Sequence, residues 1–492
     1  MRRALVIAVL ALMAAAAPAA AEPVLELGQG RDPSAATDAA GTLHVVWRDV
    51  TVFQRPLRYC RVAAAGNACT PVDIAQDTGG RPYLLLRPQD GALIALFHGT
   101  DPTLGQVTKA MVSADGGTTW SQPTPIGANF RDIDDAELSP DGAFVDSVAT
   151  NVDEVLFQRV PLGGGVEGRV VSLGTRKGGR PPRVSHLPDG RPVVIAHFAA
   201  KRLGARVPRA GADPNDPAAW GRFTAWNRLS SVDADDGDLG PTGAWLLTSV
   251  TPRSTLGTFA VRMWRWDRHG FAHPQTIGAL ARRAGRDIGQ VEDASGGSRV
   301  ALDVDLAGRL HAAWPMLPRN CGGVQCIVYR RTDRRGFGPP IVYPIGRTPE
   351  DTLQRFSIAA NAGGSGWLVW GTLGDRIRAV PLVTPPRGSR VGSRRIGRLR
   401  VSIPDFYGCV PSGGTFVHRL LVDGRRGARI LSVRFFFDAG QPARTDHRAP
   451  YRIRFTLPFP PGSRHVAGAI VEYRLADGKT RTVRLGRTFV MC

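Results

Sequence analysis

Three clusters of carboxylates have the residue types needed for metal binding or for acid–base catalysis. They are Asp132, Asp134 and Asp135 in RDIDDAEL, Asp235, Asp236 and Asp238 in DADDGD, and Glu292 with Asp293 in GQVEDASGG. Hard oxygen ligands could hold Ca²⁺, and paired carboxylates could act as general acid and base. Solvated loop acids explain the same pattern. The catalytic candidates are therefore Asp134, Asp135, Glu292 and Asp293. The one cofactor that these carboxylates suggest is Ca²⁺.

The chain lacks several other signatures of reactive sites. It has no Gly-x-Ser-x-Gly element, no phosphate-binding loop and no Cys-x-x-Cys pair. His44 and His311 occupy the same place in a repeated phrase, so repetition explains them better than metal ligation does. We therefore expect no metal site formed by these histidines.

The elements that must position these residues follow a repeat. An apolar strand, an acidic or glycine turn and a second apolar strand recur, with a Gly six residues before a large apolar residue. The clear copies begin at Gly41 (GTLHVVW), Gly91 (GALIALF), Gly142 (GAFVDSV), Gly308 (GRLHAAW) and Gly364 (GSGWLVW), and weaker copies lie at Gly190 and Gly243. Seven copies of a short-strand unit without amphipathic helices predict an all-β fold, a β-propeller of four-stranded blades.

The last unit lacks a fourth strand before the break at Pro385. The segment PVLELG at 23 has the same apolar-Gly ending as other fourth strands, such as PTPIG at 123 and VYPIG at 342. We therefore expect the N-terminal segment to close the ring as the outer strand of the last blade, which removes two sheet edges. Seven blades fit best, and six remain an alternative.

One turn resembles a known element. Ser113-Ala114-Asp115-Gly116-Gly117-Thr118-Thr119-Trp120 matches the Asp-box of the sialidase-like, bacterial neuraminidase repeat superfamily of β-propellers. In that superfamily the box is a structural turn remote from the active site, so the resemblance implies structural roles. The residues concerned are Ser113, Asp115, Gly117, Thr119 and Trp120.

The resemblance also suggests where a ligand would bind. Arg31-Asp32-Pro33 resembles the Arg-Ile-Pro element that carries a ligand-binding arginine in sialidases, and Arg48-Asp49 follows the next strand. Arg31, Arg48 and Asp49 are thus ligand-binding candidates. Phe356-Ser357 stands where the family shows Tyr-Ser, and a phenyl ring has no oxygen for nucleophilic attack. The sequence therefore predicts no hydrolysis of sialosides, and Phe356→Tyr alone should not create it.

The chain ends and the cysteines indicate export. Residues 1–21 combine Arg2 and Arg3 with an apolar run and an Ala-rich cleavage site, which is typical of a signal peptide. No later apolar run is long enough to span a membrane. In an exported chain the six cysteines favour three disulfides, pairing Cys60 with Cys69, Cys321 with Cys326, and Cys409 with Cys492.

Composition changes after residue 384. The propeller is expected over 22–384, a basic Pro/Gly/Arg linker over 385–400 and a small Ig-like β-sandwich over 401–492, which resembles bacterial immunoglobulin-like modules. Residues 385–492 hold 21 Lys and Arg against six Asp and Glu. The net charge of +21 is therefore concentrated there and does not predict a nucleic-acid partner.

These features together favour a secreted or periplasmic monomer that recognises an extracellular glycan or cell-envelope polymer without catalysis. An exo-glycosidase or lyase that uses the carboxylates named above is the alternative. If the chain is an enzyme, we expect a glycoside hydrolase.

Overall fold

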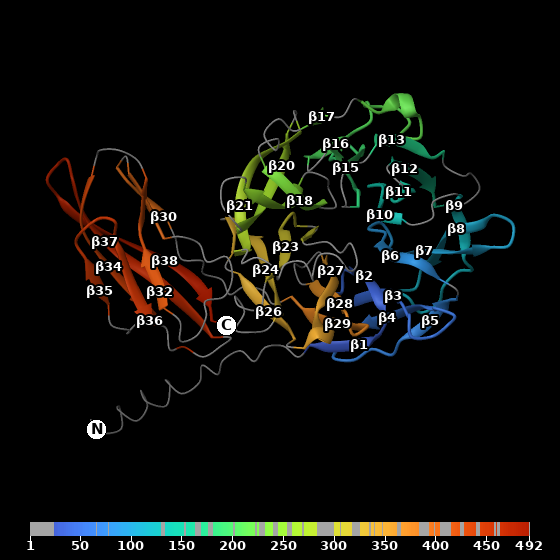
Figure 1. Cartoon of the computed structure of the whole chain (residues 1–492), viewed down its shortest axis with the longest axis horizontal. Helices are drawn as coiled ribbons and strands as arrows, with labels where there is room; N and C mark the ends of the chain where they lie inside the picture. Colours follow the sequence, from blue (N-terminus) through green and yellow to red (C-terminus); the bar gives the residue numbers. More distant parts are fainter. Residues whose placement is uncertain are drawn as a thin grey trace, which may run out of the picture.

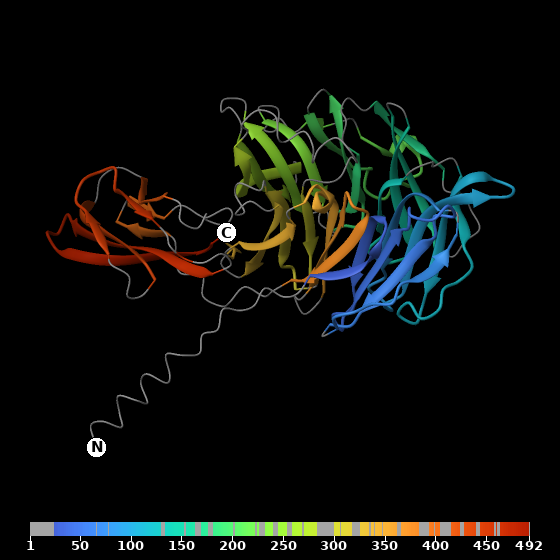
Figure 2. The same cartoon turned by 60° about the horizontal axis from the view of Figure 1, so that its bottom comes forward.

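The computed structural model describes residues 24–491 except 65, 77, 129–132, 152–153, 163–168, 176–180, 200–201, 222–223, 226–231, 240–244, 253–257, 268–269, 283–299, 306, 317–324, 334–335, 339, 347, 362–365, 383–392, 398, 404–414, 424–427, 439–442, 457–458 and 460–462. Most of these residues are in strands, and the described part also contains two 3₁₀ turns, at Pro217–Ala219 and Pro349–Asp351. Figure 1 shows a ring of sheets with the C-terminal strands to one side, and Figure 2 shows the same arrangement from another angle.

Seven antiparallel sheets form the ring, as the sequence predicted. In chain order their strands are β2 (Arg31–Thr37), β3 (Leu43–Arg48), β4 (Leu57–Val62), β5 (Val72–Ala75); β6 (Gly79–Leu86), β7 (Leu93–Asp101), β8 (Gly105–Ser113), β9 (Thr124–Ala128); β10 (Ile133–Leu138), β11 (Phe144–Asn151), β12 (Glu154–Pro161), β13 (Val171–Thr175); β14 (Arg183–His186), β15 (Pro192–Ala199), β16 (Arg202–Arg206), β17 (Thr224–Ala225); β18 (Val232–Leu239), β19 (Trp245–Pro252), β20 (Thr258–Asp267), β21 (Gly270–Arg282); β22 (Ala301–Val304), β23 (Leu310–Met316), β24 (Gln325–Asp333), β25 (Gly336–Phe337), β26 (Ile341–Gly346); and β27 (Leu353–Ala360), β28 (Gly366–Thr372), β29 (Arg376–Pro381).

The N-terminal strand completes the last blade. β1 (Leu25–Gln29) pairs antiparallel with β29, so the strand order is β1-β29-β28-β27. Leu25 and Leu27 are buried. Gly30 lies against Trp47, and a Cβ there would stand 2.3 Å from the Trp47 ring. The predicted outer strand is confirmed.

Glycine turns and cores between blades explain the repeat. In blade one Gly41 has φ +85° and donates its N–H to the Asp38 carbonyl at 3.0 Å, so the turn between the first two strands needs a residue free of Cβ strain. The apolar residues form seven buried clusters, and each cluster joins two neighbouring blades, including the last and the first. The repeated apolar positions therefore supply both faces of every interface.

Side chains on the innermost strands also join neighbouring blades. The Leu84 N–H donates to Ser34 Oγ at 2.9 Å, the Val184 N–H donates to Asp135 Oδ2 at 3.0 Å, and the Ala360 N–H donates to an Asp303 oxygen at 2.6 Å. Burial raises the pKa of Asp303 to about 7. These bonds give otherwise unpaired edge amides an acceptor.

Blades one and six each contain a chain of hydrogen bonds through an Asp, a His and a Tyr. The Tyr59 hydroxyl lies 2.7 Å from His44 Nδ1, and Tyr329 lies 2.9 Å from His311 Nδ1. The other ring nitrogen of His311 lies 3.2 Å from Asp305 Oδ2. This common geometry explains the repeated histidines as connectors of strands.

The His311 link predicts a dependence of stability on acid. Burial lowers the pKa of His311 to about 4 from an ordinary value near 6.5, so the neutral ring is favoured in the folded state. The contribution of the neutral His311 ring to the free energy of unfolding is fully present above about pH 6.5 and is lost as the pH falls toward 4. Compared with His311→Gln, the native protein should lose about 3 kcal/mol of its free energy of unfolding over this window.

Urea unfolding of both proteins at several pH values checks this expectation. Subtracting the free energy of unfolding of His311→Gln from that of the native protein cancels the contributions of other titrating groups. Asp303 is one of them, and its raised pKa makes the protein more stable as the pH falls. A difference that stays constant from pH 7 to pH 4 would contradict the assignment.

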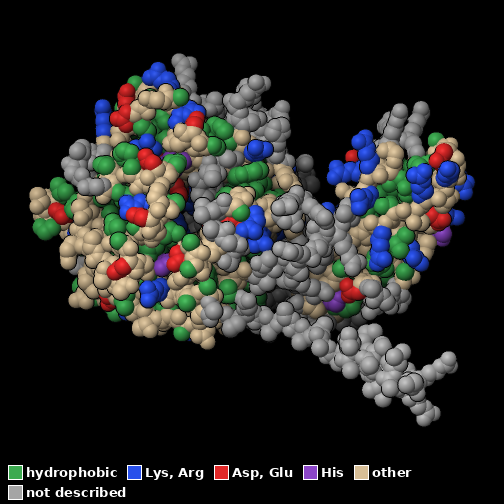
Figure 3. Space-filling view, turned by 180° about the vertical axis from the view of Figure 1, so that it is seen from behind, with side chains coloured by type: hydrophobic (Ala, Val, Ile, Leu, Met, Phe, Trp, Pro, Cys, Tyr) green, Lys and Arg blue, Asp and Glu red, His purple; other side chains and the backbone are tan. Residues whose placement is uncertain are grey.

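The C-terminal strands form three further sheets around their own core. They are β30 (Ser393–Ile396), β31 (Leu399–Ser402), β33 (Leu421–Asp423); β32 (Thr415–Arg419), β36 (Arg452–Thr456); and β35 (Arg444–Asp446), β34 (Ala428–Phe437), β37 (Arg464–Leu475), β38 (Thr480–Val490). β30 lies within the stretch expected to be a linker, because the buried Ile396 follows the arginines that made this stretch resemble one. Basic side chains gather on these strands (Figure 3).

One predicted disulfide is confirmed. Cys60 and Cys69 are bonded, with their Cα atoms 5.9 Å apart. Cys326 is also disulfide-bonded, whereas Cys321, Cys409 and Cys492 lie outside the described residues. In the described part of the chain, no helix has the length and hydropathy needed to cross a membrane.

Candidate ligand-binding site at the mouth of the propeller

One end of the propeller gathers arginines from several blades. The innermost strands all begin on this face, and the second strands end there, because each blade is an antiparallel meander. The first residues of β2, β6, β10, β14 and β27 therefore lie at one end of the propeller, which we call the mouth. Its basic residues are Arg31, Arg48, Arg81, Arg183 and Arg355.

Asp32 organises one side of the mouth. Its φ of 56° is unusual for a residue with a side chain. Its carboxylate accepts from Arg48 Nη2 at 3.1 Å and from Arg355 Nη1 at 3.3 Å. Arg31 forms an ion pair with Asp375 in the turn between β28 and β29. The first strand of blade one is thus tied to blade seven by charge.

Arg81, Arg183 and Arg355 lie close enough for the charges of Arg81 and Arg183 to act on Arg355. Burial, followed by repulsion from Arg81, lowers the pKa of Arg355 to about 10. The Arg81 guanidinium lies 4.6 Å from the centre of the Tyr83 ring. Arg183 Nη1 donates to the Asp134 carbonyl at 3.1 Å. The three come from blades two, four and seven, so no single hairpin brings them together.

Some donors in this group lack an acceptor. The Nε atoms of Arg48, Arg81 and Arg355 are buried and have no hydrogen-bond partner among the described residues. Buried polar groups in folded proteins are almost always paired, so each exception needs an explanation. Arg48, Arg81 and Arg355 each contribute one such donor at this end of the propeller.

The carboxylates predicted to be catalytic occupy separate positions. Asp134 accepts from Thr150 Oγ1 at 2.6 Å. Asp135 accepts the Val184 N–H, and burial raises its pKa. Glu292, Asp293 and Asp132 lie outside the described residues, as do the side chains of Asp235, Asp236 and Asp238. Among the described residues, no group of three or more His, Cys, Asp or Glu could hold a metal ion.

All three predicted ligand residues have protein partners, and Arg48 donates to Asp32. Arg31 is half exposed and bonded to Asp375. Asp49 is 1% exposed, accepts from Thr51 N at 2.8 Å and lies 2.9 Å from Arg58 Nη2, so it fixes the loop after β3. Arg48 alone of the three combines a position at the mouth with an unpaired nitrogen.

Phe356 lies away from the mouth. Its ring is 3% exposed and packs in the core between the last two blades, with Trp370 and Tyr329. The preceding residue, Arg355, belongs to the mouth. The mouth is therefore reached from this strand by Arg355 and not by Phe356.

The turn formed by residues 113–120, which resembles an Asp-box, connects blades one and two through contacts with Tyr59. Asp115 accepts from the Thr119 N–H at 2.9 Å, the Thr119 hydroxyl at 2.7 Å, the Ser113 hydroxyl at 2.8 Å and the Thr118 N–H at 3.0 Å, and these bonds lower its pKa to about 2. Ser113 Oγ accepts the Gly117 N–H at 2.8 Å. Trp120 packs edge-on against Tyr59 of blade one, with ring centres 5.1 Å apart.

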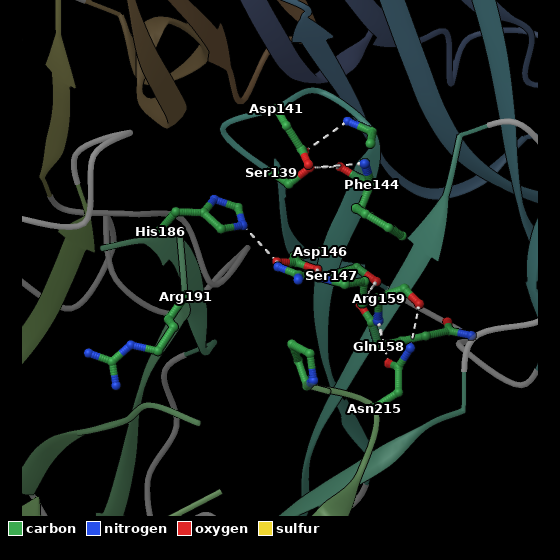
Figure 4. Close-up of polar contacts among 12 residues, drawn as sticks. Ser139, Asp141, Phe144, Asp146, Ser147, Gln158, Arg159, His186, Arg191 and Asn215 are labelled. Atoms are coloured by element: carbon green, nitrogen blue, oxygen red, sulfur yellow. Dashed lines mark hydrogen bonds and ion pairs between the residues drawn. The ribbon is translucent and has the colours of Figure 1, made fainter. Parts of the chain in front are cut away.

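A buried ionic cluster joins blades three and four (Figure 4). Asp146 is 0% exposed and accepts two bonds from Arg159, at 2.7 and 2.6 Å. His186 Nε2 lies 2.6 Å from the same carboxylate. Asp146 lies on β11, away from the strand end that reaches the mouth, so we interpret this cluster as structural.

Sequence reasoning missed the central arginines of the mouth. Arg81 is the arginine of GGRPY at 79, and Arg183 ends the related stretch GGRPPR at 178. That recurrence was the available signal. It was hidden because the chain is rich in arginine throughout.

No family model matches this chain, and no curated protein matches it. Solved structures resemble its fold. They include Kuenenia stuttgartiensis hydrazine synthase (12% identity, 73% of this chain and 97% of that one, TM-score 0.44) and the β-propeller domain of Myceliophteria thermophila Cps50 (Swd1) (9%, 73% and 100%, 0.42). A Hadza microbial sialidase, Hz136, also matches (11%, 72% and 66%, 0.35). Likeness at this level concerns the fold alone, and we draw nothing about function from it.

Proposed function

We propose that this chain is an exported recognition protein whose propeller mouth binds a carboxylate-bearing glycan without catalysis. The observation that carries the proposal is the set of buried guanidinium nitrogens without protein partners on Arg48, Arg81 and Arg355. Arginine is the residue best suited to recognise a carboxylate, because its planar fork matches the two oxygens.

The rim supports a ligand with apolar faces. Phe53 is 100% exposed, and Val52, Leu104 and Leu373 are also exposed. All four lie on turns between the second and third strands of blades seven, one and two, and those turns are on the face of the mouth. A sugar ring presents flat C–H faces together with polar edges, so it can use both the arginines and this apolar rim.

The absence of catalysis is part of the proposal. Asp134 and Asp135 accept bonds from Thr150 and from the Val184 N–H, so both support neighbouring strands. An exo-glycosidase or lyase is the competing function. Purified protein incubated with a panel of fluorogenic glycosides that includes sialosides should release no product.

Replacing a mouth arginine should weaken binding of an acidic sugar. A charge-assisted hydrogen bond contributes about 1.5–3 kcal/mol, so Arg355→Met and Arg81→Met should each raise the Kd for oligogalacturonate roughly 10- to 100-fold. Calorimetric titration measures this directly. Phe53→Ala should weaken binding without lowering Tm, because its side chain is fully exposed.

Arg191→Met is the matched control. Arg191 pairs with Asp189 at 2.6 Å in the turn between β14 and β15, at the end of the propeller opposite the mouth. Its replacement should leave the Kd unchanged. If the Arg81 and Arg355 variants bound oligogalacturonate with the affinity of the native protein, the proposal would be overturned. Equal affinities of the native protein for neutral and acidic sugars would overturn it as well.

A further inference from the structure

A serine, a histidine and an aspartate lie in a row at one end of the C-terminal sheet. Asp438 follows β34, and Ser463 precedes β37. The Asp438 N–H donates to the Val466 carbonyl at 2.9 Å, and the Val466 N–H donates to Asp438 Oδ1 at 2.7 Å. The two strand ends that carry these side chains are therefore fixed to each other.

His465 connects the other two side chains through its two ring nitrogens. Nδ1 lies 2.5 Å from Asp438 Oδ2, and Nε2 lies 2.7 Å from Ser463 Oγ. An ionised carboxylate only accepts hydrogen bonds, so the proton is on Nδ1. In the tautomer whose one proton is on Nδ1, Nε2 accepts the Ser463 hydroxyl proton. This is the order of nucleophile, base and orienting acid.

The surroundings hold this order in place. Phe459 stacks on the His465 ring with centres 3.6 Å apart, and Phe489 packs against it at 5.7 Å. Asp438 has a φ of 48°, a conformation that costs a residue with a side chain free energy and that clusters at functional sites. The side chains of His465 and Asp438 are 12% and 33% exposed, so solvent reaches the group.

We propose that Ser463, His465 and Asp438 form a second site, separate from the propeller mouth, that cleaves carboxylic esters. The aromatic rings beside His465 favour a small apolar acyl group. Exposed Arg residues on the neighbouring strand β38, such as Arg481 and Arg484, attract anionic esters to this part of the chain by long-range electrostatics.

The reaction uses only the ester and water. Ser463 Oγ bonds to the carbonyl carbon while its proton moves to His465 Nε2. The bond to the leaving oxygen breaks, and that oxygen takes the proton from Nε2 to become an alcohol. Water then attacks the acyl-serine, again passing a proton to Nε2, and the acid leaves as Ser463 Oγ regains the proton. No oxidant, reductant or metal is needed.

Covalent labelling tests the proposal on the full chain. Purified protein is incubated with a fluorophosphonate probe, and the modified residue is identified by mass spectrometry of a digest. We expect the adduct on Ser463 and none in Ser463→Ala. General-base assistance contributes about 10²–10⁴-fold, so His465→Gln should react at least about 100-fold more slowly. Hydrolysis of p-nitrophenyl acetate should fall in parallel.

Ser432→Ala is the matched control. Ser432 also donates to a carboxylate on this sheet, Glu472 at 2.9 Å, but has no histidine between them. Its replacement should leave labelling unchanged. Absence of an adduct on Ser463 in the native protein, or equal labelling rates with and without His465 in folded variants, would overturn the proposal and leave a purely structural lock.

Discussion

Asp146→Ala should lower the free energy of unfolding of the protein by about 3–5 kcal/mol. The carboxylate is 0% exposed and is bonded to Arg159 and His186, whose side chains are 16% and 1% exposed. Removing it leaves a guanidinium and an imidazole buried without their acceptor. Breaking one partner of a buried ion pair is strongly destabilising for this reason.

Urea-induced unfolding of the two proteins measures the effect. Asp189→Ala is the control, since Asp189 pairs with Arg191 at the surface, where such pairs contribute about 0–1 kcal/mol. A loss for Asp146→Ala no larger than the loss for Asp189→Ala would show that the cluster does not hold blades three and four together.

Deletion of residues 24–30 should destabilise the propeller by more than about 5 kcal/mol. The deletion removes β1 and with it Leu25 and Leu27, and burial of each leucine contributes about 1.5–3 kcal/mol. It also removes the Gln29 carbonyl that accepts the Trp47 Nε1 proton at 2.8 Å. The outer edge of β29 would then be exposed to pairing with other chains.

Thermal unfolding of the truncated protein checks this expectation. Glu26→Ala is a suitable control, because Glu26 lies on the same strand but its side chain is 52% exposed and 3.6 Å from Arg376. The control should have the native Tm. A truncated protein with the native Tm would mean that β1 is a dispensable strand.

The repeat allowed the ring to be predicted from the sequence. Each blade repeats the same sequence features, such as the glycine turn at Gly41 and the apolar residues on both faces of β3. The pattern therefore occurs seven times in one chain. Closure by β1 followed from counting strands. β30 was missed because its exposed Arg394 and Arg395 resemble the linker that precedes them.

Arg31 and Arg48 were named as ligand-binding candidates from the sequence, and they lie at the start of β2 and at the end of β3. Arg81, Arg183 and Arg355 come together only through the ring, from strands that are far apart in the sequence. No spacing along the chain encodes such a meeting. The partners of Asp49 and Asp135, which are Arg58 and the Val184 N–H, could not be predicted either, because only the folded chain brings them together.

The most direct test of carboxylate recognition is a crystal structure of the protein soaked with galacturonate. We expect the sugar in the propeller mouth with its carboxylate oxygens about 3 Å from guanidinium nitrogens of Arg81 and Arg355. A mouth without the sugar at saturating concentration, or a sugar bound there with its carboxylate facing solvent, would contradict the proposed recognition.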